Sequence, residues 1–232
     1  MTVAATEEVL IVPGYQGSGE SHWQCWLHAQ LPASRMLDDV DWHKPVLADW
    51  AEKVREEIAL ATQPLWIVAH SFGCLATAVA VVDRPQSVAG VIFVAPADPE
   101  RFNLLGLGSV DSPRLEVRTL ADVLRHKPLE VPGLLIASEN DPWLTLEKAQ
   151  YWATIWGLEL HNAGHVGHIN TESGFGPWPQ LLDILSLQQN RYVSTAASIP
   201  GIEHRMSRGR GSLLAKVRRH TRTQLSLVPA GA

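Results

Sequence analysis

The sequence predicts an α/β protein with a doubly wound, mostly parallel sheet of about six strands and helices on both faces. Short runs rich in Val, Ile and Leu alternate along the chain with longer stretches whose apolar residues recur at helical spacing. The short runs are apolar at successive positions, which is typical of parallel strands that are covered on both faces. Alternating strands and helices favour βαβ units joined right-handedly into one sheet.

Five strands and five helices can be placed from these patterns. The strands are expected at residues 9–12, 65–69, 88–94, 134–137 and 158–161. The helices are expected at residues 23–31, 47–61, 73–82, 144–156 and 179–187. The clearest helical spacing is that of Leu47, Trp50, Val54 and Ile58. Residues 96–132, between two strands, show no clear pattern and predict a minimal lid.

Periodicity fades near residue 190, where we place the end of the main domain. Residues 191–232 are small, polar and basic, with eight Arg or Lys and one acidic residue, Glu203. This composition predicts a basic, disordered extension after a domain of residues 1–190. Such an extension either has no function of its own or anchors the protein to a polyanion.

Composition excludes several classes of protein. A hydrophobic fraction of 46% and a charged fraction of 19% are typical of a globular protein. Apolar runs are too short for a membrane span, and acids stand near the N-terminus where a secretory signal has basic residues. We therefore expect a cytoplasmic protein. Cys25 and Cys74 suggest neither a disulfide framework nor a metal site.

The stretch Ala69-His70-Ser71-Phe72-Gly73 follows an apolar strand and precedes a helix of small residues. This is the strand–turn–helix setting of a nucleophile elbow, in which a sharp turn lifts a serine hydroxyl above the sheet. The positions two before and two after the serine need small side chains, which Ala69 and Gly73 provide. The pattern predicts Ser71 as a nucleophile, although Ser-x-Gly alone also occurs at ordinary strand ends.

Candidate partners for the serine follow two later strands, in the chain order Ser, Asp, His that this elbow requires. Asp141, in the stretch SENDPW, is favoured over Glu139, which lies closer to its strand end. The histidine is more ambiguous, since His165 and His168 both lie in NAGHVGHINTESG. A metal site that also uses His161 is disfavoured because glycines interrupt the helix it would need.

The first strand leads into Gly14-Tyr15-Gln16-Gly17-Ser18-Gly19-Glu20-Ser21, which differs by one residue from the phosphate-binding pattern G-x-x-x-x-G-K-[ST]. Glu20 replaces the lysine and would repel phosphates, so nucleotide binding is disfavoured. The glycines instead suit a loop whose backbone N–H groups turn toward an anion. Ser18 and Ser21 are expected in turn and helix-cap roles.

With these motifs the chain resembles the small serine hydrolases of the retinoblastoma-binding protein 9 type, within the α/β-hydrolase superfamily. The stretches VPGYQGSGESHWQ, VAHSFGC and GHINTESGFGPWP carry the resemblance, which spans about residues 8–188, and ASENDP supports it. It implies Ser71 as nucleophile, Asp141 as orienting acid and His168, rather than His165, as base. The basic extension and residues 100–130 have no counterpart in it.

These assignments predict a serine hydrolase that cleaves an ester or amide bond of a small acyl substrate through an acyl-enzyme. The backbone N–H groups of Tyr15 (or Gln16) and Phe72 would form the oxyanion hole. Gln16, His70 and Trp143 are candidate substrate-binding residues, and Trp23, Trp26 and Trp178 could help line an acyl pocket. No cofactor or metal is expected, and no nucleic acid is expected to bind the main domain. A non-catalytic binding protein on the same fold is the alternative.

Overall fold

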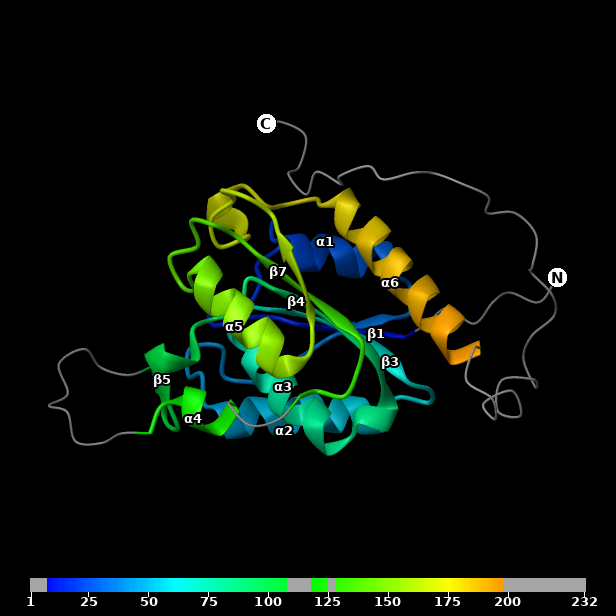
Figure 1. Ribbon diagram of the computed structural model, residues 1–232, viewed down its shortest axis with the longest axis horizontal. Coiled ribbons are helices and arrows are strands. Elements are labelled where there is room, and N and C mark those ends of the chain that lie inside the picture. Colours follow the sequence, from blue (N-terminus) through cyan, green and yellow to red (C-terminus); the bar gives the residue numbers. More distant parts are fainter. Residues whose placement is uncertain (1–7, 108–117, 125–127, 198–232) are drawn as a thin grey trace, which may run out of the picture.

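A six-stranded parallel sheet forms the centre of the protein (Figure 1). The computed structural model describes residues 8–107, 118–124 and 128–197. The strand order is β2-β1-β3-β4-β7-β8. The strands are β1 (Val9–Val12), β2 (Ser34–Met36), β3 (Leu65–His70), β4 (Val88–Val94), β7 (Gly133–Ala137) and β8 (Glu159–Asn162). The predicted fold class is confirmed.

Helices cover both faces of this sheet (Figure 1). One face carries α1 (Trp23–Gln30) and α6 (Pro179–Ala197). The other carries α2 (Leu47–Leu60), α3 (Phe72–Asp83) and α5 (Leu146–Trp156). The buried positions of α2 are the predicted ones, and Trp50, Val54 and Ile58 are at most 2% exposed. Burying such a side chain contributes on the order of 1.5–3 kcal/mol.

Successive residues of the central strands enter two separate hydrophobic clusters. In β1, Leu10 and Val12 pack with α2 and α3, whereas Val9 and Ile11 pack with α1 and α6. All four are 3% exposed or less. Side chains of a strand alternate between faces, so burial on both faces makes every position apolar. This is the physical reason for the uninterrupted apolar runs in the sequence.

The structure differs from the expected elements at the sheet edges and after the fourth strand. Strand β2 was not predicted, because its three residues, Ser34–Met36, are half-buried and carry no apolar run. Between β4 and β7 the described residues form a short hairpin, β5 (Phe102–Asn103) with β6 (Gly106–Leu107), and the short helix α4 (Leu120–Leu124). These elements occupy the segment predicted as a minimal lid.

Helix α6 is longer than expected and continues to Ala197. Arg191 forms an ion pair with Glu159 of β8 at 2.6 Å, and the ring of Tyr192 lies edge-on to Trp66. The helix therefore passes the expected domain end at residue 190. Most of the basic extension, residues 198–232, lies outside the described residues. Within the described part of the chain, no helix is both long and apolar enough to cross a membrane.

Candidate active site

Ser71 lies on a sharp turn between strand β3 and helix α3. Its φ of 52° and ψ of −123° fall outside the helix and strand regions, and its N–H donates to the carbonyl of Val94 at 3.1 Å. Such a backbone conformation is costly and persists only where surrounding structure holds it. A side chain at Gly73 would place its Cβ 2.3 Å from the carbonyl oxygen of Pro13. The predicted need for a small residue there is therefore confirmed.

His168 lies between Ser71 and Asp141. Its Nε2 is 2.9 Å from Ser71 Oγ, and its Nδ1 is 2.9 Å and 3.0 Å from the two carboxylate oxygens of Asp141. A carboxylate only accepts hydrogen bonds, so Nδ1 carries the proton. The unprotonated Nε2 can then accept a hydrogen bond from the hydroxyl of Ser71. The three residues are at most 8% exposed. Each follows a different parallel strand, namely β3, β7 and β8.

Local hydrogen bonds hold Asp141 and the His168 loop. The backbone N–H of Trp143 donates to Asp141 Oδ1 at 2.8 Å, which fixes the carboxylate at the start of its loop. The N–H of His168 donates to Ser173 Oγ at 3.0 Å. Gly167 has a φ of 65°, and a Cβ there would lie 2.5 Å from Ser173 Oγ. A glycine is thus required immediately before His168.

The alternative acid and histidine, Glu139 and His165, are paired with each other outside this arrangement. The carboxylate of Glu139 lies 3.0 Å from His165 Nδ1, and the His165 side chain is 73% exposed. Neither residue has a hydrogen bond to Ser71 within the described part of the chain. The structure therefore brings together Ser71, Asp141 and His168, which are the three residues that the family resemblance implies.

Two backbone N–H groups beside Ser71 have no hydrogen-bond acceptor among the described residues, those of Tyr15 and Phe72. The Gln16 N–H, the alternative to Tyr15, donates to the carbonyl of Trp42 at 2.8 Å. The loop after β1 lies against Ser71, because a Cβ at Gly14 would be 2.7 Å from Ser71 Cβ. Phe72 is the first residue of α3, where N–H groups have no intrahelical partner.

The candidate substrate-binding residues lie in different environments. Gln16 is exposed. The ring of Trp143 lies 6.0 Å from the ring of His168, between centroids. The guanidinium of Arg101 lies over the Trp143 ring, 5.3 Å from its centroid. His70 is only 5% exposed, and its Nε2 lies 3.0 Å from the carbonyl oxygen of His168. A direct substrate contact by His70 stays a prediction.

His22, which the sequence analysis did not single out, belongs to a buried group of aromatic rings next to Ser71 and His168. The ring of His22 contacts those of Trp23 and His70, and His70 contacts His168 at 4.9 Å between ring centroids. Burial, and then the electrostatic interaction with His168, lower the pKa of His22 to about 4. Burial also holds the pKa of His70 well below its usual value. His22, rather than Ser18 or Ser21, caps helix α1, accepting the Gln24 N–H at 3.2 Å.

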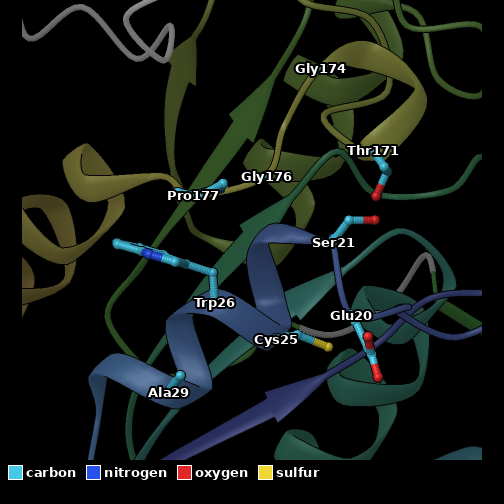
Figure 2. Close-up of a pocket in the computed structure, with 9 residues that line it drawn as sticks. All are labelled: Glu20, Ser21, Cys25, Trp26, Ala29, Thr171, Gly174, Gly176 and Pro177. Carbon is cyan, nitrogen blue, oxygen red and sulfur yellow. The ribbon is translucent and has the colours of Figure 1, made fainter. Parts of the chain in front are cut away.

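A surface pocket with a volume of about 690 Å³ opens between the start of α1 and the loop after His168 (Figure 2). Trp26 and Cys25 of α1 line one part, and Figure 2 shows Ser21 facing Thr171 across another. Glu20 is the charged residue of the lining, and together with burial it raises the pKa of the Cys25 thiol. The raised pKa makes Cys25 a poor nucleophile. Trp23 and Trp178, also considered for an acyl pocket, are fully buried.

The residues described contain no group of three His, Cys, Asp or Glu side chains placed to hold a metal ion. Cys25 and Cys74 are free thiols. The groups that the structure brings together at Ser71 are a hydroxyl, an imidazole and a carboxylate. The imidazole can take the proton of Ser71 while the carboxylate orients and stabilises it, which is the geometry of nucleophilic catalysis.

Known proteins with similar sequences or structures include several hydrolases. The chain is 24% identical over 187 residues to the YdeN hydrolase of Bacillus subtilis, a match covering 78% of this chain and 95% of that protein. A YdeN-like hydrolase of Pectobacterium atrosepticum is 35% identical with a TM-score of 0.70, over 81% of this chain and 92% of that one. Est1E of Butyrivibrio proteoclasticus, solved with ferulic acid bound, shares the fold at 14% identity with a TM-score of 0.54, over 82% of this chain and 90% of that one.

A family model described as serine hydrolase matches residues 9–187. This range begins at β1 and ends within α6, so it includes the whole sheet and all of the residues around Ser71. The extent of this match, together with the 35% identity to the Pectobacterium protein, is sufficient to assign the chain to a family. The chain belongs to the serine hydrolase family.

Proposed function

We propose that the protein is a serine esterase, which cleaves an ester bond of a small substrate through an acyl-enzyme formed on Ser71. The observation that carries the proposal is the 2.9 Å contact between Ser71 Oγ and His168 Nε2, continued by His168 Nδ1 to Asp141. A serine hydroxyl is a weak nucleophile unless a base takes its proton as it attacks. This contact places the base at hydrogen-bond distance from that proton.

The first step is attack of Ser71 Oγ on the carbonyl carbon of the substrate, with transfer of the hydroxyl proton to His168 Nε2. Asp141 holds the Nδ1–H tautomer and stabilises the imidazolium that forms. The oxyanion of the tetrahedral intermediate accepts hydrogen bonds from the N–H groups of Tyr15 and Phe72. Each such donor typically lowers the barrier by about 3 kcal/mol.

Collapse of the intermediate transfers the proton from His168 to the leaving alcohol and leaves an acyl group on Ser71. In the second half, His168 takes a proton from water, the hydroxide equivalent attacks the acyl carbon, and Ser71 is released with its proton restored. We assign esters rather than amides because the carbonyl carbon of an ester is more electrophilic than that of an amide, which is stabilised by resonance with its nitrogen. Amide cleavage by the same residues is the secondary possibility.

The pocket beside α1 is the proposed site for the leaving alcohol. It adjoins both relevant loops, because Glu20 and Ser21 continue the loop that carries Tyr15, and Thr171 continues the loop that carries His168 (Figure 2). Its lining includes the indole of Trp26 and the ring of Pro177, which suit an apolar or aromatic group. A closer kinship with the retinoblastoma-binding protein 9 type and a cytoplasmic location both stay predictions.

The proposal is tested with a fluorophosphonate probe and a panel of short-chain p-nitrophenyl esters, with Ser71→Ala measured beside the unchanged protein. We expect the probe to label Ser71 and the substitution to abolish labelling and ester cleavage while the circular dichroism spectrum is retained. Equal hydrolysis by both proteins would show that Ser71 is not the nucleophile. Folded protein that resists the probe and cleaves no ester would favour the non-catalytic binding protein.

A further inference from the structure

Two consecutive carbonyl groups of the His168 loop accept hydrogen bonds from buried side chains that are remote in the sequence. His70 Nε2 lies 3.0 Å from the carbonyl oxygen of His168, 98 positions away. Trp23 Nε1–H donates to the carbonyl of Ile169 at 2.8 Å, 146 positions away. A carbonyl oxygen only accepts, so Nε2 is the protonated nitrogen of His70. Both donors are 5% exposed or less.

The backbone at Ile169 is one that this residue type rarely adopts. Its φ is 49°, in the left-handed region, and a β-branched side chain there is a genuine outlier. Its side chain is fully buried in the cluster that includes Trp23 and Trp178. A strained conformation persists only where its surroundings hold it, and the hydrogen bond from Trp23 to the Ile169 carbonyl does so at this residue.

The two donors come from the elements that also carry the other parts of the site. His70 is the residue before Ser71, and Trp23 begins α1 at the end of the loop that carries Tyr15. By contrast, the N–H groups of this loop donate to side chains outside those segments: Gly167 to Asn140 Oδ1, in the loop of Asp141, and His168 to Ser173 Oγ, five positions later. The carbonyl bonds thus connect the loop of the base directly to the segments of the nucleophile and the oxyanion hole.

The His70 bond suits a site in which His168 becomes positively charged. Burial first, then electrostatic interactions with His168 and His22, hold the pKa of His70 well below its usual value. His70 therefore stays neutral when its ring contacts an imidazolium 4.9 Å away. A neutral donor keeps the loop in place without adding a second positive charge beside the base.

We propose that Trp23 and His70 are positioning residues, which hold His168 at hydrogen-bond distance from Ser71 by fixing the carbonyl groups of His168 and Ile169. Neither side chain takes part in the hydrogen bonds that join Ser71, His168 and Asp141. The expected loss of kcat rests on the proposed function. The position of His168 does not, because it is a property of the folded protein and can be measured without turnover. Loss of either bond lets the loop relax, and misplacement of a base by about 1 Å can reduce a rate by about 100-fold.

The first test compares Trp23→Phe with Trp66→Phe. Both changes remove an indole N–H from a fully buried tryptophan, but Trp66 Nε1 has no hydrogen-bond partner within the described residues. For Trp23→Phe we expect kcat for a p-nitrophenyl ester to fall about 10- to 100-fold, with KM changed less than twofold. Trp66→Phe should keep the original kcat. Equal kcat values for the two variants, or a loss confined to KM, would overturn the proposal.

The second test compares two substitutions of His70. His70→Gln keeps an uncharged N–H donor near the position of Nε2, whereas His70→Leu has no donor. We expect His70→Gln to retain most of kcat and His70→Leu to lose it to the same extent as Trp23→Phe. The melting temperature of each variant shows whether a loss of kcat comes from unfolding of the whole protein. Equal activity of the Gln and Leu variants in folded protein would show that the hydrogen bond to His168 is not what matters.

A third measurement does not need any turnover. In ¹⁵N-labelled protein the Nδ1–H of His168, bonded to Asp141, gives a downfield proton resonance that Asp141→Asn identifies by its loss. We expect Trp23→Phe and His70→Leu to shift or broaden this resonance and Trp66→Phe to leave it unchanged. If the protein cleaves no ester but these shifts occur, the proposed function fails and the positioning role stands. An unchanged resonance in Trp23→Phe would contradict the positioning role whatever the activity.

Discussion

The carboxylate of Glu139 lies 3.0 Å from Nδ1 of His165, so the two rivals of Asp141 and His168 form a pair of their own. Asn162 Nδ2 also donates to Glu139 at 2.8 Å, which holds that carboxylate at the surface. Each loop after β7 and β8 therefore supplies one residue to the Ser71 site and one to an exposed pair. Sequence order alone does not separate these two pairs, but their burial does.

Substitution of Asp141 should reduce kcat strongly, whereas substitution of Glu139 should leave kcat almost unchanged. Asp141→Asn removes the group that fixes the His168 tautomer, so we expect kcat for a p-nitrophenyl ester to fall about 10⁴-fold. Glu139→Gln should change kcat less than twofold, because an exposed pair contributes little to stability or geometry. Steady-state kinetics at pH 7.5 measure both. A large loss in Glu139→Gln with an active Asp141→Asn would reverse the assignment.

Gly14 should tolerate no side chain, because of its close approach to Ser71. An added Cβ would lie 2.7 Å from Ser71 Cβ and 3.2 Å from the carbonyl oxygen of His70, so the loop or Ser71 must move. For Gly14→Ala we expect kcat to fall about 100-fold, since the Tyr15 N–H, which is the proposed oxyanion donor, and Ser71 would both be displaced. Gly19→Ala is the matched control, because a Cβ there meets no atom within 4 Å. Similar kinetics for the two variants would contradict the predicted oxyanion loop.

The central elements were predictable because burial leaves a direct mark on the sequence. Strands β1 and β4 have the predicted bounds, since both are covered on each face and end where the apolar run ends. The edge strand β2 and the last turns of α6 were not predictable. Pairing of Ser34–Met36 with β1 and contacts of Arg191 and Tyr192 with distant residues leave no local pattern.

The candidate site also has a part that could be predicted from the sequence and a part that could not. Ser71, Asp141 and His168 could be selected because each follows a strand of a parallel sheet, whose carboxyl ends meet at one edge. Their catalytic roles stay predictions until activity is measured. The bonds from Trp23 and His70 to the His168 loop join residues 146 and 98 positions apart. Only the folded chain shows that these side chains meet that loop.

The buried His22 makes the stability of the protein dependent on pH. Burial, and then the electrostatic interaction with His168, lower its pKa in the folded protein to about 4, whereas an unfolded chain has the ordinary value of about 6.5. Between these values the unfolded chain binds a proton that the folded protein does not, so the free energy of unfolding falls as pH decreases through this window. The loss from His22 is roughly 3 kcal/mol, and His70 acts in the same direction.

His22→Asn measures this contribution, because asparagine does not titrate and can still cap α1 by accepting the Gln24 N–H. Guanidinium unfolding at pH 7 and pH 4.5 should show a smaller loss of unfolding free energy in His22→Asn than in the unchanged protein. His43→Asn, at an exposed site, is the control and should behave as the unchanged protein does. A pH-dependent loss of the same size in all three proteins would exclude His22 as a source.

Trp26 should affect the use of bulky leaving groups more than that of small ones. Its indole lines the pocket between the loops of Tyr15 and His168, and truncation to alanine removes the largest apolar surface of that lining (Figure 2). For Trp26→Ala we expect KM for a naphthyl ester to rise about 10-fold relative to KM for the matching methyl ester, as loss of one aromatic contact implies. The same acyl group in both esters confines the difference to the leaving alcohol. Val123→Ala, which shortens an exposed side chain of α4, is the control. If Trp26→Ala raises KM equally for both esters, the leaving alcohol does not occupy this pocket.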